Sequence, residues 1–465
     1  MVMPWLYIFI QILWVYVVDP KVQPIDNNSK PRVLILTDIS SLTQDKGEPD
    51  DGQSMIRLLL YANELDIEGL IATSNLEHDQ AVRPDLIKKV VEAYGKVRQQ
   101  LVLHDRRYPS EADLSKTIFG GQPIAGREIA YQKSIGAGKD TDASQWIIRA
   151  VDKKDPRPLW VLIWGGSADL AQALWKVQKT RSPEALKIFV NKIRVHSIGH
   201  QDATGPWIVA NFPALSYVLQ GNSIRGMYRG GDTSLTRSDW VKKNIWNHGP
   251  LGDLYVDYNG GDIWSYKTGP VRGIKEGDSP SFLRFIPNGL NNINEPSWGG
   301  WGGRFRKGDD GKTWVDAVDK FANYRSDYDE AMATVYRWRS AWQSDFAARI
   351  TWCATNYQNA NHAPTIPGTT IFVRKRAGEL VNLDQPGVID PDGDAISYKW
   401  FFYPEASDFT RELPELQTNQ FSCSFVAPQV ARPYRLHLIL EVSDNGTPSL
   451  VRYKRFVVTI DPTNH

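Results

Sequence analysis

Short, mostly apolar runs that alternate with amphipathic stretches constrain the fold of this chain more than any other feature. Segments 33–37, 67–73, 159–164 and 193–199 are mostly apolar and have the length of buried strands. Stretches with apolar residues at helical spacing lie between them, at 54–65, 84–97 and 167–177. Strands that alternate with helices are typical of parallel βαβ units, whose functional sites lie at the carboxyl ends of the strands. We therefore expect an α/β domain with a mostly parallel sheet and flanking helices.

The 465 residues are too many for one ordinary core, so a second domain is expected. Segment 297–306 is too rich in glycine for regular structure, and 327–353 predicts one long helix that packs on the first domain. We therefore assign residues 30–357 to the α/β domain with this helical extension. A polar linker with prolines begins at 358, and short alternating runs separated by turn residues follow it. These predict an immunoglobulin-like antiparallel β-sandwich over 358–465.

Residues 1–29 are expected to form a signal peptide or N-terminal tail, because residues 1–18 are an apolar run that is short for a membrane span. No basic residue precedes the run and no small-residue cleavage site follows it, so an uncleaved anchor or a buried strand stays open. A signal peptide implies a secreted, extracellular protein. The two cysteines, Cys353 and Cys423, either pair between domains or stay unpaired in the cores.

The charge balance argues against nucleic acid as a partner. The formal net charge is only +1, whereas phosphate binding usually shows as a basic excess. The 17 tryptophans are many for this length, and tryptophan stacks on sugars as well as filling cores. Trp207, Trp298 and Trp301 are therefore candidates for a sugar platform, with core or interdomain packing as the alternative.

Carboxylates gather after the first strand. Asp38 follows the run 33–37, and Glu48, Asp50 and Asp51 come shortly before the expected helix. Adjacent carboxylates repel unless a cation or hydrogen bonds neutralise them, and Ca²⁺ accepts several oxygen ligands in flexible geometry. The alternative is that Asp50 caps the helix and the others are exposed.

Three segments resemble motifs of the nucleoside hydrolases, in the same order and at the same strand-to-helix junctions. They are Leu36-Thr37-Asp38 with Asp50-Asp51, Glu68 to Asn75, and Gly165 to Leu174. A closer resemblance is to cellulose-binding proteins with a nucleoside-hydrolase-like domain. It rests on the segments 200–207, 248–252, 275–283 and 299–304, and it extends into the β-rich C-terminal domain.

The resemblance implies a calcium ion that holds the attacking water and the hydroxyls of a sugar. By position, Asp38, Asp51, the main-chain carbonyl of Ala168 and Asp278 would hold the metal, with Asp38 as the base. Asp50 would grip a sugar hydroxyl. Asn75 would contact the sugar hydroxyls or order its loop, and a plain turn role is the alternative for Asp278.

Departures from the nucleoside hydrolase pattern put the nucleoside itself in doubt. Leu36 replaces the first aspartate of the motif, and an insertion separates Asp38 from Asp50. The sugar-binding segment aligns near Trp207 and Asn211, with the tryptophan in place of polar groups.

Three further polar residues are candidates for the substrate side of the site. His200 is a candidate general acid, while Asp202 and His248 are candidate substrate contacts. Hydrogen-bonded loop residues are the alternative for all three.

In the C-terminal domain, Asp390-Pro-Asp-Gly-Asp394 is interpreted as a plain turn, although similar turns of extracellular modules sometimes bind calcium.

The leading hypothesis is a secreted, calcium-dependent hydrolase of N- or O-glycosyl bonds that acts on a glycoside, oligosaccharide or nucleoside. The alternative is a protein that binds cellulose or another polysaccharide without turnover. A carbohydrate or nucleoside-like small molecule is the expected partner in either case.

Overall fold

A central eight-stranded sheet organises the first part of the molecule, with the order β3-β2-β1-β4-β5-β6-β10-β9. The computed structural model describes residues 30–43, 48–74, 81–261, 269–321, 327–409 and 412–463. Every pairing in the sheet is parallel except that of β9 with β10. The strands are β1 (Arg32–Thr37), β2 (Asp66–Ala72), β3 (Ile118–Gly120), β4 (Leu159–Ile163), β5 (Ile193–Ile198), β6 (Ser216–Gln220), β9 (Phe305–Lys307) and β10 (Trp314–Asp316).

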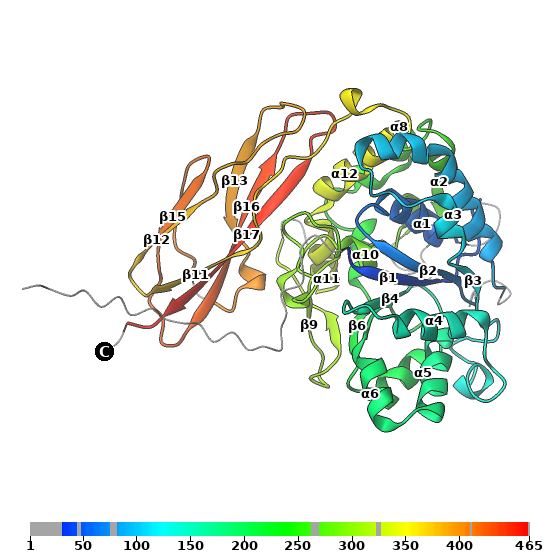
Figure 1. Ribbon diagram of the computed structural model, residues 1–465. Helices are drawn as coiled ribbons and strands as arrows, with labels where there is room; N and C mark the ends of the chain where they lie inside the picture. The colour runs from blue at the N-terminus through cyan, green and yellow to red at the C-terminus, as the bar shows by residue number, and fades with distance from the viewer. Residues whose placement is uncertain are drawn as a thin grey trace, which may run out of the picture. The chain divides into compact units, whose positions relative to one another are not determined.

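Helices cover both faces of this sheet. Helices α1 and α2 lie on one face, and α4 and α5 lie on the other (Figure 1). Because both faces are covered, β1 and β4 are buried along their whole length, which explains their continuous apolar runs. The helices are α1 (Asp50–Leu60), α2 (Pro84–His104), α3 (Glu111–Ser115), α4 (Asp142–Asp152), α5 (Ala168–Thr180), α6 (Pro183–Asn191), α7 (Thr204–Asn211), α8 (Ser238–Asn244), α9 (Pro250–Asp253), α10 (Pro280–Leu283), α11 (Asp327–Tyr336) and α12 (Arg339–Trp352).

The predicted helix over 327–353 is two helices, α11 and α12, so that prediction was wrong. The chain breaks at Arg337 and Trp338, which turn toward the C-terminal domain. Arg337 pairs with Glu405 of that domain at 3.2 Å, and the Trp338 ring meets the Tyr403 ring edge-on at 5.6 Å. Tertiary contacts of these two side chains therefore override a locally helical sequence.

The C-terminal domain is a sandwich of two sheets around one core, as predicted. One sheet has the order β11-β17-β16-β13 and the other β12-β15-β14. Apolar residues from both sheets form the core between them, among them Leu383, Phe425, Leu438 and Phe456. The strands are β11 (Ile371–Arg376), β12 (Leu380–Asp384), β13 (Ser397–Phe402), β14 (Gln417–Thr418), β15 (Ser422–Val426), β16 (Tyr434–Ser443) and β17 (Val451–Asp461).

The edge strand β11 departs from the expected antiparallel pattern, because it pairs with β17 in parallel. The other pairs of both sheets are antiparallel. The chain enters the sandwich through the linker after α12, and a parallel first strand suits that entry. The two cysteines are buried and unpaired.

Arg455 of β17 connects the sandwich to the α/β domain. Its fully buried guanidinium donates to the carbonyl oxygens of Leu290, Trp298 and Gly299 at 3.0–3.3 Å. Trp298 and Trp301 are themselves buried, at 5% and 0% exposure. These two tryptophans therefore pack in the interior and form no open sugar platform.

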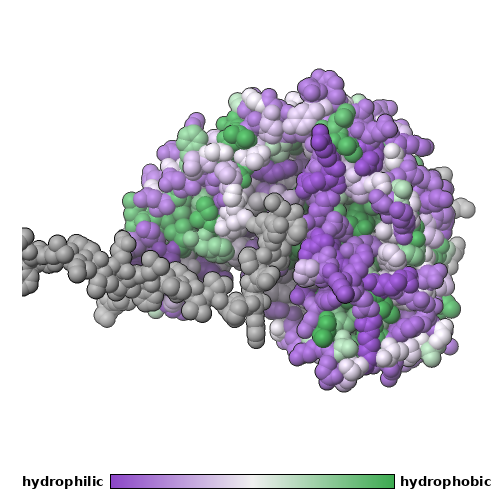
Figure 2. Space-filling model, viewed as in Figure 1, coloured by the Kyte–Doolittle hydropathy of each residue, from purple (hydrophilic) through white to green (hydrophobic). Residues whose placement is uncertain are grey.

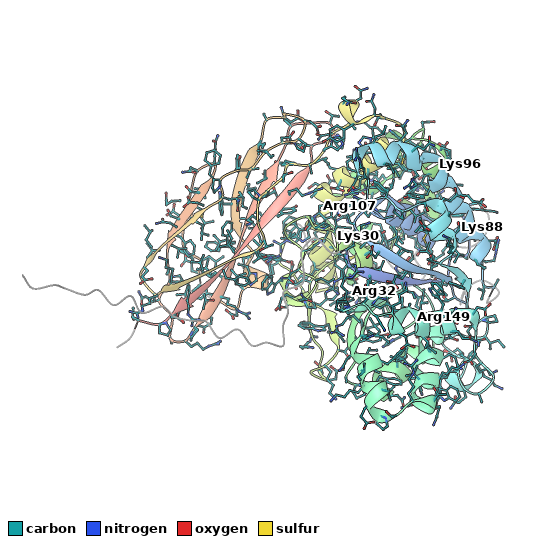
Figure 3. The ribbon with its side chains drawn as sticks, in the orientation of Figure 1. Lys30, Arg32, Lys88, Lys96, Arg107 and Arg149 are labelled. Atoms are coloured by element: carbon teal, nitrogen blue, oxygen red, sulfur yellow. The ribbon has the colours of Figure 1, made fainter. Side chains whose placement is uncertain are left out.

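Arg32, labelled in Figure 3, begins β1 and forms ion pairs at this end of the strand. It donates to Glu68 at 2.6 and 3.0 Å and lies 3.7 Å from Asp155. Positive and negative groups are thus matched at this edge, whereas Asp38 follows the opposite end of the same strand.

Hydrophilic side chains dominate the visible face of the α/β domain, with small apolar areas between them (Figure 2). Within the described residues, the structure contains no helix with both the length and the apolar character of a membrane span. The predicted signal peptide, residues 1–29, lies outside the described residues.

Candidate functional site

Three aspartates from separate parts of the chain meet at the carboxyl edge of the sheet. Asp50 and Asp51 open α1, and Asp278 lies between β8 (Val271–Gly273) and α10. One carboxylate oxygen of each lies within 4.8 Å of those of the other two. Asp38, directly after β1, adjoins them and contributes to the electrostatic field at Asp51 and Asp278. We call these four residues the aspartate cluster.

Burial and mutual repulsion shift the protonation of the cluster. Burial raises the pKa of Asp38 to about 8, and the charges of Asp50 and Glu48 add to the effect. Burial and the neighbouring carboxylates also raise the pKa of Asp51 and of Asp278 well above the usual range. Without a counter-charge, the cluster would therefore hold protons near neutral pH.

Local contacts hold the cluster in place. The hydroxyl of Thr37 donates to Asp51, and the hydroxyl of Ser281 donates to the main-chain oxygen of Asp278 at 2.7 Å. Gly165 lies directly against Asp38, since a Cβ on this glycine would come within 2.5 Å of the aspartate side chain. A glycine is therefore required at the start of the turn that leads to Ala168.

Lys275 is a member of the site that the sequence prediction missed. Its ammonium group pairs with Glu48 and lies 3.9 Å from the Oδ2 atom of Asp50. The side chain is almost fully buried, and the two carboxylates raise its pKa although burial opposes this. The sequence did draw attention to Lys275, because this residue begins the 275–283 motif. Only the folded structure shows which carboxylates it contacts.

The neighbouring Glu276 fixes the same loop from inside the protein. Its carboxylate accepts hydrogen bonds from Arg57 of α1 at 3.1 Å and from Ser279 at 2.7 Å, and also from Tyr255. Both charged groups of the Arg57–Glu276 pair are fully buried. The pair therefore ties the loop that carries Asp278 to the helix that carries Asp50 and Asp51.

Asp278 and two hydroxyl groups have polar atoms without partners. Among the described residues, the Oδ2 atom of Asp278 is buried and receives no hydrogen bond, and Asp278 is only 3% exposed. The buried hydroxyls of Thr73 and Ser74, just after β2, also have no partner. Ser74 faces Gly166, the residue after Gly165. At this edge of the sheet, these three polar atoms are therefore free of hydrogen bonds to other described residues.

His200 and Asp202 lie beyond the Gly166 turn. Asp202 accepts from Ser167 and Thr204 through both main-chain and side-chain groups at 2.7–3.0 Å, so it organises the loop. The His200 ring packs near Tyr217, and burial lowers its pKa. A neutral imidazole is expected there at neutral pH, which disfavours His200 as a proton donor.

Trp207, Asn211 and His248 have their contacts with residues outside the aspartate cluster. Trp207 packs against Tyr131, and the Asn211 amide donates to the carbonyl oxygen of Trp207 at 2.8 Å. The His248 ring lies 3.0 Å from the carbonyl oxygen of Trp246. Ala168 is buried as the first residue of α5. Asn75 lies outside the described residues, so its role stays a prediction.

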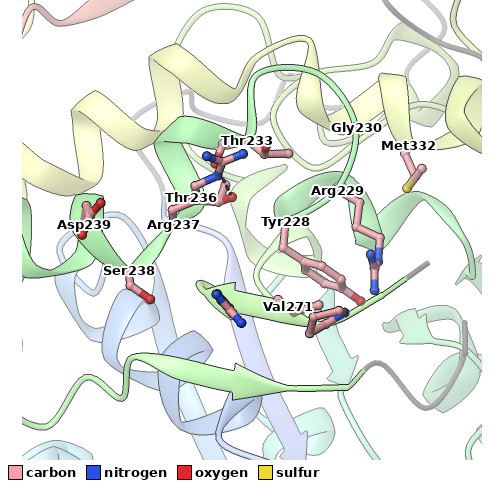
Figure 4. A pocket seen from close by; sticks show the side chains of 12 residues that line it. Tyr228, Arg229, Gly230, Thr233, Thr236, Arg237, Ser238, Asp239, Val271 and Met332 are labelled. Atoms are coloured by element: carbon pink, nitrogen blue, oxygen red, sulfur yellow. Dashed lines mark hydrogen bonds between the residues drawn. The ribbon is translucent and has the colours of Figure 1, made fainter.

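A separate cavity of about 750 Å³ lies beside β8 (Figure 4). Arginines and hydroxyl groups line much of it, including Arg229, Arg237, Thr233 and Ser238. It shares no residue with the aspartate cluster.

The cluster fits a hard divalent cation. The atoms that it offers as metal ligands are carboxylate oxygens. A cation would also give the unpartnered Oδ2 atom of Asp278 the positive partner that it lacks. Such oxygen sets are preferred by Ca²⁺ over the softer transition metals. Asp38, Asp51 and Asp278 are the residues that would hold it, with Asp50 beside them.

Comparison with known proteins gives two family matches. The family described as "Cellulose-binding Sde182, nucleoside hydrolase-like domain" matches residues 32–305, and "Cellulose-binding protein Sde0182, C-terminal domain" matches residues 380–460. A solved structure of a nucleoside hydrolase-related hypothetical protein from Saccharophagus degradans, associated with carbohydrate metabolism, is 32% identical. It covers 93% of this chain and 100% of that chain, with a TM-score of 0.75. The resemblance inferred from the motifs is therefore confirmed.

Two other solved structures are far less similar. A 2,6-sialyltransferase from Photobacterium sp. JT-ISH-224 has 17% identity and a TM-score of 0.15 over 20% of this chain and 18% of that chain. Mouse protocadherin PcdhgC3 has 14% identity and a TM-score of 0.15 over 23% of this chain and 35% of that chain. No curated protein matches the chain.

Proposed function

Because this chain belongs to the family of cellulose-binding Sde182-type proteins with a nucleoside hydrolase-like domain, we propose that it is a calcium-dependent hydrolase of glycosyl bonds. The observation that carries this proposal is the aspartate cluster at the carboxyl edge of the sheet, with a buried and unpartnered oxygen on Asp278. A neutral carbohydrate or a nucleoside-like compound is the proposed substrate class. The apolar run at 1–18 supports secretion as part of the same proposal.

A bound calcium ion would lower the pKa of a water molecule and orient it toward the anomeric carbon. The protein residues then have distinct roles. Asp51 and Asp278 are the most buried acids and serve as fixed anionic ligands. We assign the role of base to Asp38, which directly follows β1 beside these ligands and is less buried than they are.

Asp50 is more exposed than Asp51 and Asp278, and the buried Lys275 lies beside it. The Asp50 side chain is 19% exposed and accepts hydrogen bonds, so it suits a sugar hydroxyl. Lys275 partly offsets the negative charge beside it and donates hydrogen bonds. Together they offer one acceptor and one donor for a polyol.

Binding without turnover is the second candidate, and one observation favours it. The His200 ring packs near Tyr217 and the Trp207 ring near Tyr131. Asn211 and His248 contact main-chain oxygens close by in the chain, and none of these partners belongs to the aspartate cluster. A protein that has the metal ligands of a hydrolase site but no residues to protonate or bind the leaving group would bind a polysaccharide and release it unchanged.

Calcium titration and turnover assays on the same preparations test the proposal. The wild type would be compared with Asp51→Ala and with Asp309→Ala, an exposed control on the β9–β10 hairpin. We expect calcium-dependent hydrolysis of aryl glycosides, cello-oligosaccharides or nucleosides in the wild type and the control, and its loss in Asp51→Ala. Calcium binding and cellulose retention without any cleavage would overturn the hydrolase proposal and leave the binding function.

A further inference from the structure

The turn that precedes β13 in the sandwich brings three more carboxylates together. Oxygens of Asp390, Asp392 and Asp394 lie within 4.8 Å of one another. Gly393 has a φ of +83°, a conformation that favours glycine, and it lets the chain curl around these groups. The Oδ1 atom of Asp390 accepts the main-chain N–H groups of Asp392 and Asp394 at 2.9 and 3.0 Å. These two hydrogen bonds satisfy only one oxygen of Asp390.

A buried aspartate from another loop points to a ligand at this turn. Asp444, which follows β16, is only 5% exposed. Its Oδ1 atom accepts from the main-chain N–H groups of Leu450 and Gly446 at 2.9 and 3.0 Å and from the Asn361 side chain at 3.1 Å. Its Oδ2 atom is buried without a partner among the described residues. The loop of Asp444 meets the turn directly, because the main-chain N–H of Ala395, next to Asp394, donates to the side chain of Asn445 at 2.8 Å.

The unpartnered atoms here are all acceptors. They are the Oδ2 atoms of Asp390 and Asp444 and the Oδ1 atom of Asn361. Buried acceptors that lack donors cost free energy, and a cation can satisfy several of them at once. The ring of His362 is already engaged, because it contacts Asp392 at 3.0 Å and His104 at 2.9 Å. The atoms that remain as ligands for a metal ion are therefore all oxygens, which suits Ca²⁺.

We propose that Asp390, Asp392, Asp394 and Asp444 form a second calcium site, at the junction of the linker and the sandwich. This site is independent of the proposed hydrolase function. It would hold the linker, because Asp392 accepts from the main-chain N–H of His362 at 2.6 Å. The His362 ring stacks on Tyr357 and meets His104 of α2, so calcium would brace the sandwich against the α/β domain.

Calcium stoichiometry and amide hydrogen exchange of the full-length protein test this proposal. We expect calcium to slow exchange in segments 361–365 and 444–450 of the wild type. Asp394→Ala removes a half-exposed carboxylate whose side chain accepts no hydrogen bond from the described residues, so the variant is expected to fold. The Asp394→Ala variant should bind one calcium ion fewer per chain. Calcium should no longer slow amide hydrogen exchange in either segment. Asp384→Ala, an exposed aspartate of β12, is the matched control and should behave as the wild type.

The two calcium sites are separated by their variants. Asp51→Ala should keep the calcium-dependent slowing in 361–365, because it alters only the aspartate cluster. A wild type without any calcium effect in these segments would overturn the proposal. Persistence of the calcium effect in both Asp394→Ala and Asp444→Asn would overturn it as well.

Discussion

Replacement of Glu276 by glutamine tests whether a buried ion pair positions the loop of the aspartate cluster. Four hydrogen bonds reach the Glu276 carboxylate. Two come from Arg57, one from Tyr255 and one from Ser279, and they divide equally between the two oxygens. In Glu276→Gln one oxygen becomes an NH₂ group, which cannot accept. Two donors then lose their acceptor in a fully buried site.

The expected cost follows from these two lost acceptors. Each buried donor without a partner costs about 1–3 kcal/mol, so the free energy of unfolding should fall by about 4 kcal/mol. The general cost of breaking a buried ion pair by removing one partner, about 3–5 kcal/mol, gives the same range. Because the loop also carries Asp278, calcium affinity should weaken as well.

Urea unfolding in the presence of a chelator measures the stability change, and calcium titration of the folded variant measures the second effect. Glu92→Gln is the matched control. Glu92 is half-exposed and lies 3.8 Å from Lys88 on α2, so its loss should cost less than about 0.5 kcal/mol. A change below about 1 kcal/mol in Glu276→Gln, or one no larger than in the control, would refute the reasoning.

Three further predictions concern other parts of the molecule. Gly165→Ala would place a methyl group within about 2.5 Å of Asp38, so calcium titration should show at least tenfold weaker binding with little loss of secondary structure by circular dichroism. Burial lowers the pKa of His437 to about 2, and the unfolded chain takes up a proton below pH 6.5 where the folded chain does not. Stability should therefore fall as pH falls below 6.5, by about 2 kcal/mol at pH 5, and His437→Gln should flatten this dependence in urea unfolding. Cys353 and Cys423 are buried thiols with raised pKa values, so a thiol reagent should react with both only after unfolding, and a reductant should leave the unfolding midpoint unchanged.

The α/β architecture was predictable because its signals are local. Buried parallel strands must be apolar along their whole length, and β1, β4 and β5 begin within one residue of the predicted strands. The start of α1 was less accurate. The helix begins at Asp50 rather than at residue 54, so Asp50 and Asp51 lie in its first turn, where the helix dipole favours negative charge.

Features that depend on distant partners were not predictable. The break between α11 and α12 and the parallel pairing of β11 both come from contacts with elements far along the chain. The same holds within the site. Asp50 and Asp51 lie close after the end of the predicted first strand, but Asp278 joins them from a loop that follows β8, outside the main sheet. The buried pair of Arg57 and Glu276 joins residues that are 219 positions apart. No local pattern distinguishes such a glutamate from an exposed one.

The charge of the cluster bears on the choice between hydrolysis and binding. If ionised, the four aspartates and Glu48 carry five negative charges, against which Lys275 supplies one positive charge. A divalent cation supplies two more, so two negative charges would remain beside the substrate. A neutral polysaccharide needs no such field in order to bind. Cleavage of a glycosyl bond does benefit from it, because positive charge develops on the sugar ring in the transition state. If calcium binding removes the protons that these acids hold without it, the remaining negative charge would support the proposed cleavage.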